Sequence, residues 1–310
     1  MARIRKSALL VVRNKEVQRG SIMKLQVMKF RKWSYIVSGA LILLSVLSLL
    51  VRGLNYGIDF SGGIAMEVKP IVQDYGIEQM REALADFKPE LQTVDGDAIL
   101  IRFGLPKGAT DAQQNERVGQ IKNILGDNVQ YEQVQIVGPK IGGELVRGGI
   151  LAILFAFIMM AIYVWVRYKG GYAVGAFCSL FLDFVLMFGF FSITGLEFNQ
   201  TAIAVILTGI GYSINDKIVN YDRIDENVKK YHKMPMGDLI DLSVNEMLRR
   251  TMLTSVSTLL AMVGLSIFGG QLLREFAYAM GFSVIMGTFT SIYISNIMLY
   301  HFNLRDSDEK

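Results

Sequence analysis

Six long apolar stretches constrain the fold of this chain more than any other feature. A helix of about 20 mostly apolar residues is long enough to cross a hydrocarbon core about 30 Å thick. Hydrophobic residues make up 52% of the 310 residues and charged residues only 19%, a composition too apolar for a soluble domain of this length. The sequence therefore predicts a polytopic α-helical membrane protein with six transmembrane helices. The predicted spans are Trp33 to Val51, Gly149 to Val166, Tyr172 to Thr194, Gln200 to Asn220, Arg250 to Phe268 and Phe276 to Phe302.

Basic residues beside the spans predict the orientation, because Lys and Arg in short flanking segments are retained in the cytoplasm. The segment 1–32 carries ten Lys or Arg and one acid, Glu16. The turn at 195–199 has no basic residue, and the turn at 269–275 has a single one. We therefore expect a cytoplasmic basic segment at 1–32, a cytoplasmic tail at 303–310, and both termini on the inner side.

Residues 52–148, between the first two spans, are polar and lack any spanning run. Their pattern predicts a small α+β domain on the outer face, with Asp95-Gly96 as a hairpin turn and a cap at Thr110 or Asp111. The order β-α-β-β-α-β is typical of a ferredoxin-like sandwich. The expected strands are Ile64 to Val68, Glu90 to Val94, Ala98 to Phe103 and Val129 to Val137, and the expected helices are Ile77 to Phe87 and Thr110 to Leu125.

The sequence indicates no enzymatic, metal or cofactor site. Cys178 is the single cysteine, and the two histidines, His232 and His301, lie about 70 residues apart without neighbouring ligands. A phosphate-binding G-x-x-x-x-G-K-[ST] motif is absent, so no ATP hydrolysis is indicated. The net charge of +4 is explained by the basic residues that set the orientation, and we expect no nucleic-acid partner.

Ionisable residues inside the spans are the strongest functional candidates, because a charge at bilayer depth costs at least ~2.5 kcal/mol and normally faces a partner or a cavity. Asp183 lies near the middle of the third span, and Asp216 lies in the inner third of the fourth. Arg250 opens the fifth span at a similar depth, so a contact between Asp216 and Arg250 is geometrically possible.

Helical spacing places small and polar residues on shared faces of these spans. One reading is close packing of the bundle, and the other is a hydrated path in which a carboxylate gains and loses a proton. The faces comprise Gly209, Ser213 and Asp216 with neighbouring Asn215 on the fourth span, Arg250, Thr254, Ser257 and Thr258 on the fifth, and Gly287, Ser291 and Ser295 on the sixth.

Several segments together resemble the SecF side of the SecD/SecF family. Gly57-Ile-Asp-Phe-Ser-Gly-Gly63, in which Gly57, Asp59, Phe60, Gly62 and Gly63 carry the pattern, is similar to the family's G-[IL]-D-F-x-G-G signature. The stretch from Gly211 to Asn227 resembles G-Y-S-x-N-D-x-I/V-V followed by D-R-I-x-E-N. Two more similar segments are Arg250-Thr-Met-Leu-Thr-Ser255 and Phe268-Gly-Gly270. The 27 residues before Met28 lie outside the pattern, and a start at Met28 stays open.

This resemblance implies half of an RND-type transporter in the bacterial inner membrane, with residues 52–148 periplasmic and residues 149–302 forming the helix bundle. It implies pairing with a SecD-like subunit and assistance to the SecYEG channel in exporting unfolded preproteins with the proton-motive force. The family's essential carboxylate and arginine fall on Asp216 and Arg250, and a further span carboxylate falls on Asp183. Lys217 departs from the pattern, which has a small or hydroxyl residue there, and it could pair with Asp216.

Two alternatives stay open at this point. An RND-type exporter of small molecules or lipids would have a larger outer domain and a second six-span half in the same chain. A translocon scaffold without proton coupling would use Asp216 and Arg250 only to lock helices together, and sequence does not separate a static ion pair from a switching one.

Overall fold

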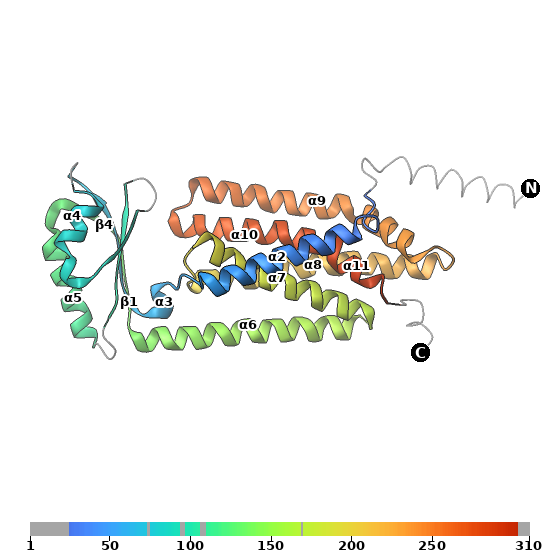
Figure 1. The fold of residues 1–310 in the computed structure, drawn as a ribbon, viewed down its shortest axis with the longest axis horizontal. Helices are drawn as coiled ribbons and strands as arrows, with labels where there is room; N and C mark the ends of the chain where they lie inside the picture. The colour runs from blue at the N-terminus through green and yellow to red at the C-terminus, as the bar shows by residue number, and fades with distance from the viewer. Residues whose placement is uncertain (1–24, 73–74, 94–96, 106–109, 169, 303–310) are drawn as a thin grey trace, which may run out of the picture.

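The computed structural model describes residues 25–72, 75–93, 97–105, 110–168 and 170–302. A four-stranded sheet domain lies at one end of an elongated bundle of helices (Figure 1). Most of the predicted basic segment 1–32, the Asp95-Gly96 turn and the tail 303–310 fall outside the described residues.

Six helices of the described chain are long and apolar enough to cross a membrane, which confirms the predicted spans. The first five are α2 (Arg31–Val51), α6 (Pro139–Arg167), α7 (Gly171–Thr194), α8 (Gln200–Lys230) and α9 (Met236–Phe268). The sixth span is composite and consists of α10 (Gln271–Phe289), the π-helix η3 (Thr290–Ser295) and α11 (Asn296–Leu299).

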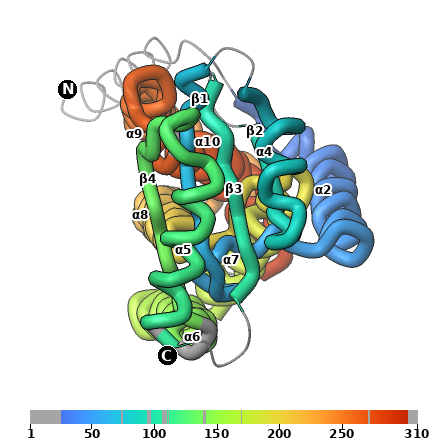
Figure 2. The backbone as a smooth tube through the Cα atoms, turned by 90° about the vertical axis from the view of Figure 1, so that its left-hand side faces the viewer, coloured from blue at the N-terminus to red at the C-terminus, as the bar shows by residue number. Residues whose placement is uncertain are grey.

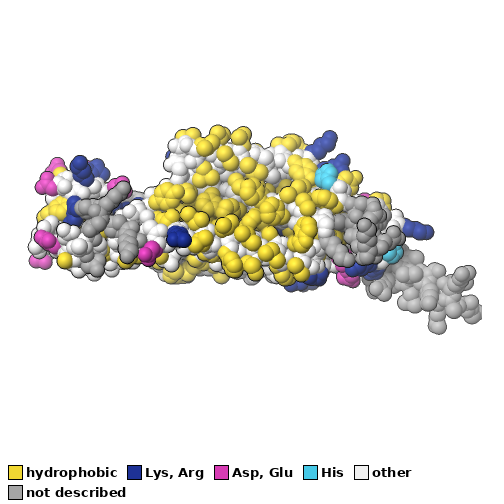
Figure 3. Space-filling model, turned by 90° about the horizontal axis from the view of Figure 1, so that it is seen from below, with side chains coloured by type: hydrophobic (Ala, Val, Ile, Leu, Met, Phe, Trp, Pro, Cys, Tyr) yellow, Lys and Arg dark blue, Asp and Glu magenta, His cyan; other side chains and the backbone are white. Residues whose placement is uncertain are grey.

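The surface of the bundle fits a lipid environment. Hydrophobic side chains cover the middle of the molecule, and charged side chains gather toward its two ends (Figure 3). Large apolar side chains such as Phe155, Trp165 and Leu260 are about two-thirds exposed, at 66%, 67% and 67%. In water such a surface would be costly, whereas in a bilayer it faces hydrocarbon.

The sheet domain has the predicted ferredoxin-like arrangement. The strand order is β2-β3-β1-β4, and every paired strand is antiparallel. Helices α4 and α5 cover the face of the sheet that points away from the bundle (Figures 1 and 2). The elements are β1 (Gly63–Pro70), α4 (Ile77–Ala83), η1 (Ala85–Phe87), β2 (Glu90–Thr93), β3 (Ile99–Phe103), α5 (Asp111–Leu125), η2 (Gly126–Asn128) and β4 (Val129–Val137).

Alternation along the strands explains why the two faces of the sheet differ. Ile64, Met66 and Val68 of β1 are fully buried in the core beneath α4 and α5. The residues between them, Ala65 and Glu67, line a cavity on the bundle side. Because strand side chains point alternately to opposite faces, one short strand supplies both the domain core and the surface that meets the membrane bundle.

Candidate functional site

A buried ion pair joins α7 and α8 near the middle of the bundle. Lys217 Nζ donates a hydrogen bond to Asp183 Oδ2 at 2.7 Å, and the two side chains are 0% and 6% exposed. Ser213 Oγ donates to the same carboxylate oxygen at 2.6 Å, and Thr290 Oγ1 donates to Asp183 Oδ1 at 2.5 Å. The Lys217 ammonium also donates to the Ser213 hydroxyl and to Thr290 Oγ1 at 3.3 Å. Both oxygens of the carboxylate and the whole ammonium group therefore have partners.

Local helix geometry brings these groups together. Side chains of an α-helix tilt toward its N-terminus, so Lys217 reaches back over Ser213, four residues earlier, and meets Asp183 on α7. Thr290 begins the π-helix of the sixth span, and π-helical turns occur often at functional sites.

Glycines let α8 and the sixth span approach closely beside the ion pair. A Cβ on Gly209 would lie 2.0 Å from Ser283 Oγ, and a Cβ on Gly287 would lie 3.0 Å from Ser213 Oγ. Ser291 Oγ donates to the Ser213 carbonyl oxygen at 3.3 Å. Small residues at a helix contact allow this approach in membranes, as the sequence pattern of the sixth span predicted.

Asp216 lies one residue before Lys217 but faces α9. Thr251 Oγ1 donates to Asp216 Oδ1 at 2.8 Å. Asp216 Oδ2 is buried and has no hydrogen-bond partner within the described part of the chain. Lys217 and Arg250 lie within electrostatic reach of this carboxyl group. Asp216 is thus half-buried and incompletely hydrogen-bonded, whereas Asp183 is fully bonded.

Two pairings of Asp216 that the sequence left possible are absent from the ion pairs of the described residues. Lys217 pairs with Asp183 instead of Asp216, because the tilt of its side chain carries the ammonium toward α7. Arg250 is exposed and forms no ion pair with Asp216 there; its neighbour Thr251 points inward and makes the contact.

The supporting polar residues are divided between two surfaces. Gly209 and Ser213 are buried against the sixth span and form part of a buried row of small and polar residues, the polar seam. Thr254 and Ser257 are exposed and donate to carbonyl oxygens of their own helix, so this chain alone does not join them to the seam. Asn215 is exposed as well. The buried side of α9 is formed instead by residues such as Thr251, so the seam of α8 continues mainly into the sixth span.

The role of Lys217 and the contribution of Thr290 were missed in the sequence. One signal could have found the pair: a lysine inside a span requires a buried acid, and Asp183 is the acid at mid-depth in the preceding span. Nothing in the sequence marks the π-helix of the final span.

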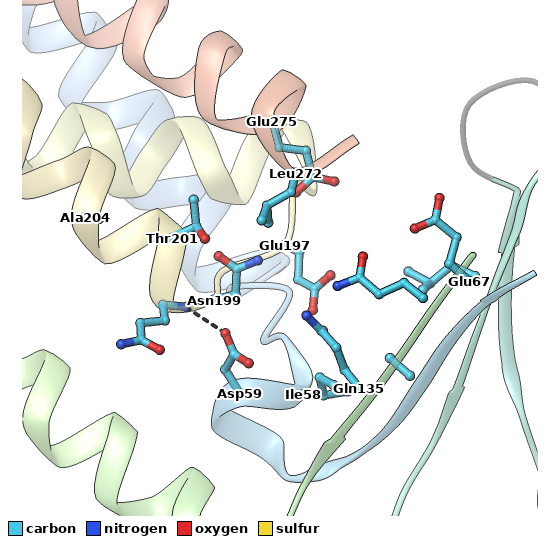
Figure 4. Close-up of a pocket in the computed structure, with 14 residues that line it drawn as sticks. Ile58, Asp59, Glu67, Gln135, Glu197, Asn199, Thr201, Ala204, Leu272 and Glu275 are labelled. Carbon is cyan, nitrogen blue, oxygen red and sulfur yellow. Dashed lines mark hydrogen bonds between the residues drawn. The ribbon is translucent and has the colours of Figure 1, made fainter. Parts of the chain in front are cut away.

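The glycine-rich segment Gly57 to Gly63, which follows α2, forms the junction between the sheet domain and the bundle. It contains the short helix α3 (Ile58–Ser61), and the Asp59 carboxylate accepts a hydrogen bond from the Gln200 N–H at 3.1 Å (Figure 4). This places a negative charge at the N-terminus of α8, where the helix dipole favours it. Gly63 has φ 156°, and a Cβ there would lie 2.6 Å from the Phe103 carbonyl oxygen, so the close approach requires glycine.

A cavity of about 440 Å³ opens between the sheet and the bundle (Figure 4). Beside it, Arg102 of β3 forms an ion pair with Glu197 of the α7–α8 loop at 2.6 Å, with side chains 14% and 16% exposed. No cluster of three or more His, Cys, Asp or Glu suited to a metal ion occurs among the described residues. Four carboxylates and four amide side chains line the cavity: Asp59, Glu67, Glu197, Glu275, Gln133, Gln135, Asn199 and Gln200.

The fold and the site define a class: a multi-pass membrane protein with a ferredoxin-like domain and charged side chains buried inside its spanning bundle. Residues 117–305 match the family model "Protein export membrane protein SecD/SecF, C-terminal", and residues 47–70 match "SecD/SecF GG Motif". The chain therefore belongs to the SecD/SecF family, as its motifs predicted.

Relatives of known name agree with this assignment. The protein translocase subunit SecF of Rickettsia bellii (strain OSU 85-389) is 41% identical over 276 residues, covering 86% of this chain and 90% of the relative. The SecF of Rickettsia conorii is 39% identical over 291 residues, covering 91% and 93%. Together with the six apolar helices, these relatives support a multi-pass protein of the inner membrane.

Solved structures give the same fold. The crystal structure of SecDF, a translocon-associated membrane protein from Thermus thermophilus, superposes with a TM-score of 0.76 at 31% identity over 87% of this chain. A second SecDF structure, in a super-membrane-facing form, gives a TM-score of 0.64 at 30% identity over 90% of this chain. The present chain spans only 38% and 39% of those two solved chains.

Proposed function

We propose that this chain is an accessory subunit of the Sec translocon that works with a SecD-like partner to couple the proton-motive force to late steps of protein export. The observation that carries the proposal is the carboxyl group of Asp216, which lies among spanning helices with one buried oxygen that has no hydrogen-bond partner among the described residues. Such a group can take up and release a proton as its surroundings change. The family membership supplies the context of protein export.

A polar surface beside Asp216 supports a membrane partner. Asn215 on α8 and Arg250, Thr254 and Ser257 on α9 are exposed, and α8 meets α9 at the Asp216–Thr251 hydrogen bond. Polar and charged groups are costly against lipid, so this surface fits contact with the spanning helices of a second subunit. The solved SecDF chains are more than twice the length matched here, which leaves room for a SecD-like half beside this one.

The proton step is assigned to Asp216 and Arg250. In the described chain the Arg250 guanidinium lies within electrostatic reach of Asp216 without an ion pair. Approach of Arg250 favours release of the proton, and withdrawal favours its uptake. Each charge that crosses the membrane potential carries ~2.3 kcal/mol per 100 mV, so a few protons supply enough energy for a domain movement.

The connection from this step to the exported polypeptide runs through α8. Its N-terminus is bound by Asp59, and the adjacent loop is tied to β3 by the Arg102–Glu197 ion pair. A displacement of α8 near Asp216 is therefore transmitted to the sheet domain. We place both termini in the cytoplasm and residues 52–148 in the periplasm, where the domain meets a preprotein leaving the SecYEG channel. The chain acts as a transport subunit powered by protons and without an enzymatic site of its own.

Release of a translocating preprotein in inverted membrane vesicles tests this function. Asp216→Asn and Arg250→Met are compared with the wild type at matched levels of assembled subunit. The matched control is Asp225→Asn, which changes a partly exposed carboxyl group of the same helix that pairs with Lys229, one turn away and outside the Asp216–Thr251 contact. We expect the first two variants to lose the proton-driven step and the control to keep it. Full proton dependence in both variants would favour the scaffold alternative.

A further inference from the structure

We propose that Lys217 is a built-in counter-ion that keeps Asp183 ionised throughout the transport cycle, so that Asp216 is the proton-exchanging carboxylate of this chain. The inference rests on the proposed function and refines it, because it removes Asp183 from the residues that exchange protons. Lys217 is a positioning residue in this scheme, and it acts by fixing the charge and place of Asp183.

Complete hydrogen bonding is the first argument. Asp183 accepts from Lys217, Ser213 and Thr290, and these donors come from α8 and η3. Lys217 in turn donates to Asp183, Ser213 and Thr290, and it is fully buried. Charge-assisted hydrogen bonds favour the ionised form of a carboxylate. Protonation of Asp183 would leave the buried ammonium without its counter-charge, which is strongly unfavourable away from water.

The contrast with Asp216 is the second argument. Asp216 accepts one hydrogen bond, from Thr251; the Ser291 hydroxyl lies near it, but its buried Oδ2 has no partner at hydrogen-bond geometry among the described residues. Asp216 faces α9 and Asp183 lies on α7 facing α8, and within the described part of the chain only Asp183 forms an ion pair with a buried cation. Asp183 is therefore held in its ionised state, whereas the carboxyl group of Asp216 can gain and lose a proton.

The helices packed around the pair carry few other charges. The segments 36–51 of α2, 148–166 of α6 and 276–299 of the sixth span contain no Asp, Glu, Lys, Arg or His. On α8 the nearest charge is Asp216, and Arg250 approaches Asp216 from α9. None of these three segments therefore carries a cation that could neutralise Asp183 if Lys217 is removed. The remaining titratable side chains on these segments and on α7 and the neighbouring turns of α8 are uncharged phenols and a thiol: Tyr163, Tyr172, Cys178, Tyr212, Tyr221, Tyr278 and Tyr293.

Removal of Lys217 alone should turn Asp183 into a titrating group. A buried carboxylate without a partner becomes neutral by taking up a proton. The variant Lys217→Met therefore gains a protonated carboxylic acid that the wild type lacks. The double variant Lys217→Met/Asp183→Asn has neither charge and retains donors and acceptors near Ser213 and Thr290.

Infrared spectroscopy of the full chain, reconstituted with its SecD-like partner in lipid, tests the inference. Protonated carboxylic acids have a carbonyl stretching band that is distinct from the carboxylate bands, and it is followed across a pH titration. We expect the band of the wild type to be unchanged in the double variant, to gain one extra component in Lys217→Met, and to lose a component in Asp216→Asn.

A band present in the wild type and missing from the double variant would show that Asp183 exchanges protons and would overturn the inference. This comparison is decisive even if Lys217→Met alone does not fold. Failure of the proposed function gives a different result, because Asp216→Asn would then leave both the spectrum and the export activity unchanged. The carbonyl bands of the wild type and the double variant would still show whether Asp183 exchanges protons.

Discussion

The Arg102–Glu197 ion pair allows a quantitative test of how the sheet domain is held against the bundle. It joins β3 to the loop between α7 and α8 through one 2.6 Å contact, and both side chains are more than four-fifths buried, at 14% and 16% exposure. The perturbations are Arg102→Met, Glu197→Gln and the double variant, which together form a double-mutant cycle.

The burial of the pair sets the expected coupling energy. Exposed ion pairs contribute about 0.2–1 kcal/mol, and hydrogen bonds to charged groups contribute about 1.5–3 kcal/mol. Because this pair is mostly buried but borders a cavity, we expect a coupling of about 1.5 kcal/mol, roughly a tenfold change in the equilibrium between docked and released sheet domain.

Distances between spin labels report this equilibrium. Labels at the exposed positions Ile124 in α5 and Leu260 in α9, in a Cys178→Ala background, follow the sheet domain relative to the bundle. We expect each single variant to broaden the distance distribution, and the double variant to add little further. Arg81→Met is the control, because it removes an exposed ion pair inside α4. A coupling energy near zero would refute the view that this contact holds the domain in place.

Three further predictions follow from single contacts. Asp59→Ala removes the acceptor of the Gln200 N–H and should destabilise the first turn of α8 by about 1 kcal/mol, seen as faster amide hydrogen exchange there; unchanged exchange would contradict it. In Gly189→Ala the new Cβ would lie 2.1 Å from Ser45 Oγ, so we expect overpacking between α7 and α2 to cost about 1–3 kcal/mol and lower the thermal midpoint, whereas alanine at a glycine facing open space should not. Burial, with a hydrogen bond to a neighbouring carboxylate, raises the pKa of Tyr168, which lies between two spans. Its neutral phenol therefore contributes stability that is complete below about pH 10 and is lost as the pH rises toward the raised pKa, so Tyr168→Phe should flatten the alkaline decline of the thermal midpoint.

The apolar patterns of the sequence predicted the existence of every span, but not the full length of the helices. Helix α6 begins at Pro139, ten residues before the predicted Gly149, and α9 begins at Met236, before the predicted Arg250. These extensions are polar segments that continue a spanning helix beyond the hydrocarbon core. A search for apolar runs ends at the membrane boundary, whereas helical hydrogen bonding does not.

The sheet domain was predicted more completely because its strands alternate and its turns carry local signals. The strand at Val129–Val137 has the predicted bounds, and α5 begins after its cap Thr110. The predicted helix Ile77 to Phe87 is divided into α4 and η1, since Leu84 leaves helical geometry.

The membrane site was predicted by residue type rather than by pairing. Asp183, Asp216 and Arg250 were identified because charges are costly at that depth, and the structure places Asp183 and Asp216 within the bundle. Which cation meets which carboxylate depends on the rotation of each helix, and a difference of one position moves a side chain by about 100° around the axis. Lys217 therefore faces α7 while Asp216 faces α9.

Proton flux through the reconstituted complex tests the central claim most directly. The chain and its SecD-like partner are placed in lipid vesicles with a pH-sensitive dye inside, and a proton gradient is imposed. We predict proton movement with the wild type and with Asp225→Asn, and its loss with Asp216→Asn. Equal flux with and without the Asp216 carboxyl group would contradict the claim that this residue carries the proton.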